Sequence, residues 1–105
     1  MYLEVADLLL EIELELRRLD MWSEKTVTKE QLMSTEPFCI DTMTFPEWIQ
    51  FVFIMRLKII LEQGAELPNT SAIAPMAEEY FRGASINAGA FISSIKKFDQ
   101  LISDR

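Results

Sequence analysis

Apolar residues recur every three or four positions along most of this chain, and this spacing constrains its fold more than any other feature. Such a period places apolar side chains on one face of an α-helix, whereas a half-buried strand would alternate at every second residue. No segment shows a clean two-residue alternation. A first helix is predicted over residues 2–22, with apolar positions at Val5, Leu8, Leu9, Ile12, Leu16 and Leu19. The sequence therefore predicts an all-α protein.

A second helix is predicted to begin after Thr44 and to end near Gly64. Thr44 and Glu47 have the spacing of a capping box, in which each side chain accepts from the backbone N–H of the other residue. Pro46 fits the first turn, where a missing N–H costs nothing, and glycine is common just beyond a helix end. Apolar residues cover nearly all faces of this helix, so we expect it to be the most buried one.

Two further helices follow in the second half of the chain. A short helix over 76–82 comes directly after Pro75 and is ended by Gly83, and a last helix starts at about Ser85 or Asn87.

Residues 23–40 contain several poor helix formers and Pro37, so we expect an ordered connection there, with one helical turn at 29–33. Long ordered connections are often functional. The prediction is a compact four-helix antiparallel bundle, forming a single domain over residues 1–105, with this long connection between its first two helices.

The 105 residues carry a net charge of −7, and residues 1–22 alone hold six acids against two arginines. No basic stripe is present, so we expect no direct binding of nucleic acid and no docking on a membrane surface, since both need clustered positive charge. An acidic chain is instead suited to docking on a basic protein, such as an RNA-modifying enzyme.

Cys39 is the single cysteine, and the chain has no histidine. An intramolecular disulfide is therefore excluded, and no zinc-ligand or Cys–His pattern exists, so we expect no metal, no cofactor and no catalytic residues. The first ten residues hold acids but no basic residue, unlike a signal peptide. The longest apolar run, Phe51–Met55, is far too short to span a bilayer. These features predict a cytoplasmic protein that is not an enzyme.

The middle of the chain contains a specific ordered set of residues: Pro37-Phe38, Asp41-Thr42-Met43, Glu47-Trp48, Gln50 and, six residues later, Arg56. With the surrounding stretch Ser34–Pro75, this set resembles the YqcC-like family of small uncharacterised bacterial proteins. Phe51 and Met55 depart from the family, which tends to have Trp and Pro there. The resemblance implies an all-α bundle without an established activity. Genes of this family often lie beside genes for tRNA pseudouridine synthases, so it also implies an accessory role in RNA modification.

The nine motif residues are the candidates for a site, and two interpretations stay open. They are Pro37, Phe38, Asp41, Thr42, Met43, Glu47, Trp48, Gln50 and Arg56. The functional interpretation is a recognition pocket between residues 34–43 and the second helix. The structural interpretation makes Glu47 a helix cap and Arg56 half of an ion pair that holds the long connection. Arg56 lies opposite Glu47 on a helical wheel, so we expect its partner to be Glu36 or Asp41.

Two hypotheses for the function follow. The first is a non-enzymatic interaction or adaptor protein that presents Pro37, Phe38, Asp41 and Trp48 to a protein partner, because aromatic side chains among polar groups dominate binding at interfaces. The alternative is a small anionic-ligand binding protein with a pocket between residues 34–43 and the second helix. In it, Arg56 would bind the anion in a cavity inside the bundle, lined by Phe45, Trp48, Phe51 and Met55. Self-association is compatible with both.

Overall fold

The computed structural model describes residues 1–104, and the regular elements of these residues are all helical. In chain order they are α1 (Tyr2–Arg18), α2 (Lys29–Leu32), the 3-10 turn η1 (Pro37–Cys39), α3 (Phe45–Trp48), the π-helical stretch η2 (Ile49–Ile54), α4 (Met55–Gln63), α5 (Ala74–Phe81) and α6 (Gly89–Ser103). Residues 1–104 contain no β-strand, so the all-α prediction is confirmed. In the same residues, no helix has both the length and the apolar character needed to cross a membrane.

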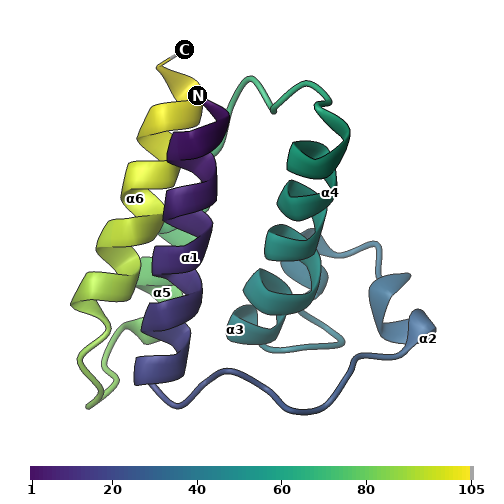
Figure 1. The fold of residues 1–105 in the computed structure, drawn as a ribbon. Coiled ribbons are helices and arrows are strands. Elements are labelled where there is room, and N and C mark those ends of the chain that lie inside the picture. Colours follow the sequence, from purple (N-terminus) through teal and green to yellow (C-terminus); the bar gives the residue numbers. More distant parts are fainter. Residues whose placement is uncertain (105) are drawn as a thin grey trace.

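Helix α1 lies between α6 on one side and α4 on the other (Figure 1). Both ends of the chain lie at the same end of the molecule, so α1 and α6 run antiparallel, and α4 also runs opposite to α1 (Figure 1). The elements α3, η2 and α4 follow one another without a break and form one rod, while α5 packs against α6. The segment that contains α2 lies beyond this rod, on the side away from α1 (Figure 1).

The core combines aliphatic side chains of α1 with aromatic side chains of the other helices. Phe53 of η2 meets Phe98 of α6 edge to face, with 4.8 Å between ring centres. Phe91 is fully buried and contacts the ring of Phe45. Burial of one such side chain stabilises the fold by roughly 1.5–3 kcal/mol. The buried stripe of α1 has the predicted helical spacing: Val5, Leu9, Ile12 and Leu16.

The first helix is shorter than the predicted range 2–22 and ends at Arg18. The reason is Asp20, whose φ of 62° lies in the left-handed region. The N–H of Met21 donates to the carbonyl of Leu16 at 2.9 Å, the long-range bond of a Schellman motif. Glycine usually occupies the left-handed position of this motif. Because aspartate occupies it here, the sequence contains no glycine signal for the end of the helix.

The predicted start and end of the second helix are both confirmed. Thr44 Oγ1 accepts from the N–H of Glu47 at 3.2 Å, and Glu47 Oε1 accepts from the N–H of Thr44 at 2.8 Å. Gly64 ends α4 with a φ of 62°. Between these ends, the π-helical stretch η2 was not predicted. Backbone bonds in a π-helix span five residues instead of four, and apolar periodicity does not reveal this change.

The connection before α3 is ordered, and it contains the single helical turn predicted at 29–33, which is α2. Thr28 and Gln31 form a second capping box at the start of this turn. The side-chain amide of Gln31 also donates to the carbonyl of Thr42 at 2.9 Å, and the hydroxyl of Thr42 donates to the carbonyl of Gln31 at 2.8 Å. These paired bonds fasten α2 to the residues that follow η1.

Helices α5 and α6 lie within a few residues of their predicted positions. Helix α5 begins at Ala74, slightly before the predicted 76–82, and α6 begins at Gly89. The N–H of Ala74 donates to Oδ2 of Asp99 on α6 at 2.7 Å. A carboxylate that is distant in the sequence therefore accepts from a backbone N–H in the first turn of α5 that has no partner within the helix. No local sequence pattern predicts such a contact.

Candidate functional site

Phe38 and Cys39 form a tight turn with an unusual backbone. Their φ angles are 57° and 49°, in the left-handed region that residues other than glycine rarely occupy. Such conformations cost about 1–3 kcal/mol each, persist only where surrounding contacts hold them, and cluster at functional sites. Cys39 is held here by burial against Met43 and Val52 in a small second core. The turn therefore fixes the ring of Phe38 beside the rod of α3, η2 and α4.

The indole of Trp48 joins this turn to the rod. It packs edge to face on Phe38, with 4.8 Å between ring centres and 73° between the planes. It also stacks on Phe53, with ring centres 6.0 Å apart. Trp48 directly precedes η2, and π-helical stretches are rare and often found at functional sites. In the sequence, Trp48 therefore lies between two uncommon backbone conformations: the left-handed turn at Phe38 and Cys39, and the π-helical stretch η2.

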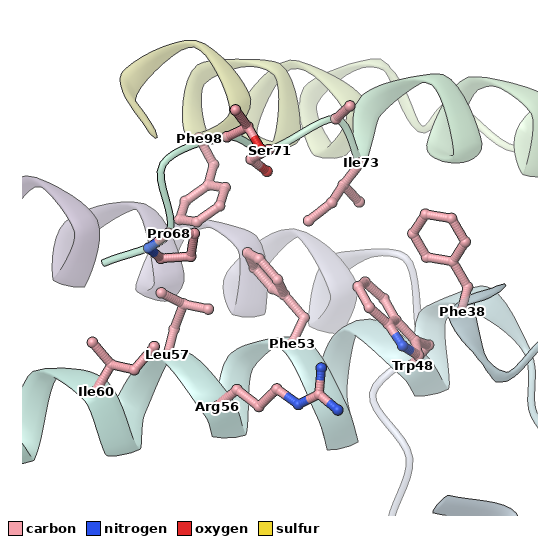
Figure 2. Close-up of a pocket in the computed structure, with 12 residues that line it drawn as sticks. Phe38, Trp48, Phe53, Arg56, Leu57, Ile60, Pro68, Ser71, Ile73 and Phe98 are labelled. Atoms are coloured by element: carbon pink, nitrogen blue, oxygen red, sulfur yellow. The ribbon is translucent and has the colours of Figure 1, made fainter. Parts of the chain in front are cut away.

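Two hollows share Phe38, Trp48 and Arg56 as lining residues. The first, here termed the outer hollow, has a volume of about 450 Å³ and lies between the connection and the rod. Its other lining residues include Leu32, Ser34, Glu36, Phe51, Met55 and Ile59. The second, termed the inner pocket, has a volume of about 310 Å³ and lies between α4, α6 and the segment before α5 (Figure 2). Its other lining residues include Phe53, Leu57, Ile60, Pro68, Ile73 and Phe98.

Arg56 is a charged residue common to both hollows, and its side chain extends from α4 toward Trp48 (Figure 2). It is exposed, and no ion pair or hydrogen bond to its guanidinium exists among residues 1–104. The prediction that Glu36 or Asp41 pairs with Arg56 is therefore wrong. Asp41 instead accepts a hydrogen bond from the hydroxyl of Ser34. This bond joins two short side chains, whereas an ion pair between Asp41 and Arg56 would immobilise the long arginine side chain.

Glu47 and Gln50, two of the predicted site residues, bond to the backbone and line neither hollow. Glu47 forms the capping box described above. Gln50 is 7% exposed and uses both ends of its amide: Oε1 accepts from the N–H of Ser23 at 2.8 Å, and Nε2 donates to the carbonyl of Ser23 at 3.0 Å. This amide holds the start of the long connection against the rod.

The remaining predicted residues shape the turn without entering the hollows. Thr42 makes the paired bonds to α2, and Met43 is buried in the second core. Pro37 opens η1, and both Pro37 and Asp41 are exposed. Of the nine candidates, the structure therefore brings together Phe38, Trp48 and Arg56 around the hollows, and it uses most of the others as supports.

A hollow does lie between residues 34–43 and the second helix, with Phe51 and Met55 in its wall as expected. Phe45, which was expected to line the same cavity, does not. It is only 3% exposed and belongs to the main core, because it stands in the first turn of the helix and faces Phe91.

Sequence reasoning missed the residues that other segments contribute to the hollows. Leu32 of α2 and Ile59 of α4 line the outer hollow, and Ile73 and Phe98 line the inner pocket. In a helix that is apolar on nearly every face, the sequence does not distinguish an exposed isoleucine such as Ile59 from a core one. Both hollows combine apolar walls with the charge of Arg56, and the outer hollow also contains the carboxylate of Glu36.

The fold and the two hollows define a small all-α protein in which Phe38, Trp48 and an arginine without a partner among residues 1–104 line both hollows. A family model described as tRNA pseudouridine synthase C matches residues 4–101. The uncharacterised protein YqcC of Escherichia coli is 31% identical over 93 residues, covering 89% of this chain and 85% of that protein. Its solution NMR structure matches with a TM-score of 0.85 and 30% identity, over 98% of this chain and 88% of that one. This chain therefore belongs to the YqcC-like family of small bacterial proteins.

Two further relatives differ in length. An uncharacterised protein of Haemophilus influenzae is 42% identical over 69 residues, so the match spans 66% of this chain and 65% of that protein. A protein of Pectobacterium carotovorum named tRNA pseudouridine synthase C is 37% identical over 67 residues. That match covers 64% of this chain but only 18% of the Pectobacterium protein.

Proposed function

We propose that this chain is a non-enzymatic adaptor that binds a tRNA pseudouridine synthase. The observation that carries the proposal is the Pectobacterium relative, in which a stretch similar to this chain makes up 18% of a longer protein named tRNA pseudouridine synthase C. Placing two modules on one polypeptide raises their effective concentration for each other and favours a contact that separate chains make by association. In this proposal, catalysis belongs to the partner.

The outer hollow supplies a surface suited to such a partner. Three large apolar side chains in its wall are about half exposed: Leu32 at 47%, Met55 at 49% and Ile59 at 48%. Polar groups, among them Glu36 and Arg56, line the same hollow. An apolar centre with a polar rim is the usual anatomy of a protein interface, and methionine adapts its shape to a partner.

The charge of the chain supports the same choice of partner. An enzyme that acts on tRNA needs positive charge, because contacts to phosphate supply much of the affinity for nucleic acid. The net charge of this chain is −7. Glu36, which lines the outer hollow, is exposed, and so is Asp41, which bonds to the lining residue Ser34. Opposite charges accelerate the encounter and disfavour wrong partners.

The test is calorimetric titration of the purified chain with purified tRNA pseudouridine synthase C from the same organism. We expect a stoichiometric complex with a Kd of about 1 μM or below. Ile59→Glu places a charge in the centre of the surface and should weaken binding about tenfold or more. Leu14→Glu is the matched control, because Leu14 is 64% exposed on α1. Absence of a complex would refute the adaptor function, and loss of binding in the Leu14 variant alone would refute the outer hollow as the surface.

A second candidate function, the binding of a small anion, is supported by the unpaired guanidinium of Arg56. In the outer hollow this idea is opposed by Glu36, whose carboxylate shares the lining and would repel an anion. The observation therefore favours the inner pocket, which has no acidic residue among its lining residues.

A further inference from the structure

The inner pocket has the chemistry of a small-molecule site. Its walls are apolar side chains from different parts of the chain, among them Phe53 of η2, Phe98 of α6, and Pro68 and Ile73 (Figure 2). Of the twelve lining residues, all within the described part of the chain, Arg56 is the one that carries a charge. A concave apolar surface with one convergent charged group is the usual form of a ligand pocket.

We propose that the inner pocket binds a small amphipathic carboxylate, with its apolar body against Phe53 and Phe98 and its carboxylate on the guanidinium of Arg56. The planar guanidinium matches the two oxygens of a carboxylate and donates to both. A phosphate dianion would meet a single cation in a chain whose net charge is −7, so a ligand with one negative charge fits better.

The contrast between Arg56 and the other arginines of residues 1–104 supports this assignment. Arg17, Arg18 and Arg82 each pair with a glutamate three or four residues earlier in the sequence, at 3.0, 2.7 and 2.8 Å. Arg56 has no such partner among residues 1–104, although carboxylates are abundant in this chain. An arginine that stays unpaired beside an apolar pocket, in an acidic protein, is available to bind an anion from solution.

The wall opposite α4 is anchored, so the pocket exists before a ligand arrives. The carboxylate of Asp99 accepts from the hydroxyl of Ser71 at 2.6 Å and from the N–H of Ala74 at 2.7 Å. The hydroxyl of Ser103 also accepts from the N–H of Ser71 at 3.2 Å. These bonds hold the segment before α5 on α6. A preformed pocket avoids the entropic cost of ordering a loop during binding.

The volume of the pocket limits the size of the ligand. It is about 310 Å³, near the lower end of the roughly 300–1,000 Å³ found for ligand pockets. The ligand class is therefore a carboxylic acid with one ring or a short aliphatic chain. This proposal rests on the second candidate function, the binding of a small anion, and specifies its ligand. Because the test below uses this chain alone, its failure would leave the adaptor function untouched.

The experiment is a titration of the full chain with phenylpropionate, followed by calorimetry and by NMR of the two indole N–H groups. We expect saturable binding with a millimolar or lower Kd and a shift of the Trp48 signal. Trp22, which lies under Arg17 away from the pocket, is an internal control and should not shift. The neutral analogue phenylpropionamide should bind about 10- to 100-fold more weakly, since it lacks the charge-assisted bonds.

Two substitutions test whether Arg56 is responsible for the binding of phenylpropionate. Arg56→Gln should weaken phenylpropionate binding by about 10- to 100-fold, and because the side chain is exposed the variant should fold. Lys58→Gln is the matched control, since Lys58 is an exposed cation two residues away that does not line the inner pocket. It should bind as the wild type does. Absence of saturable binding, an unchanged Trp48 signal, or equal affinity in Arg56→Gln would each overturn the proposal.

Discussion

Gln50 offers a sharp test of how the long connection is held, because one side chain makes both bonds. Gln50 is 7% exposed, and its side-chain amide forms hydrogen bonds of 2.8 and 3.0 Å with the backbone of Ser23. Gln50→Met keeps the length and most of the volume of the side chain but removes both bonds. Each bond is worth about 1 kcal/mol net, so we expect a loss of about 2 kcal/mol. For a domain of this size, that lowers the melting temperature by roughly 8–16 °C.

The assay is urea unfolding followed by far-ultraviolet circular dichroism, with the slope of the transition compared between variants. Gln63→Met is the matched control, because Gln63 is exposed at the end of α4 and should change stability by less than about 0.5 kcal/mol. If Gln50→Met is as stable as the control, the amide does not hold the connection. The residue would then have to be reconsidered as part of a binding surface.

Three further substitutions test other parts of the account. Thr44→Ala removes the capping box of α3 and should cost about 1 kcal/mol, and an unchanged unfolding midpoint would refute the cap. Asp99→Ala removes the acceptor of Ser71 and Ala74, so we expect a loss of about 1–3 kcal/mol and faster hydrogen exchange at Ala74; slow exchange at that amide would show that the anchor is unnecessary. Asp20→Val places a β-branched residue at a φ of 62° and should destabilise by about 1–2 kcal/mol, whereas equal thermal stability would argue against the left-handed helix end.

The parts of the fold that were predicted from sequence are those with a local physical signal. The Thr44 and Glu47 capping box needs only two side chains three residues apart, and Gly64 ends its helix through its own freedom at positive φ. The spacing of apolar residues likewise identified the buried face of α1. These signals depend on a single turn or a single helix, so they can be recognised without knowing the tertiary contacts.

The features that the sequence did not reveal depend on packing between distant segments. Cys39 adopts a left-handed conformation because it is buried in the second core, and Phe38 does so because it packs against the main core; neither residue type favours that region. The inner pocket needs Phe98 and Ile73 to meet the rod, which no local pattern shows. Glu36 or Asp41 was expected to pair with Arg56 because Glu47 lies on the opposite face of the helix, but helix geometry does not fix where the side chains of the preceding connection point.

Hydrogen exchange of the chain with and without the purified synthase tests most directly the proposal that a tRNA pseudouridine synthase binds at the outer hollow. We predict protection of α2, η1, η2 and the first part of α4, the elements that contribute residues to the hollow, with no change on α1. Exchange that is identical with and without the synthase, or protection confined to α1, would contradict the claim.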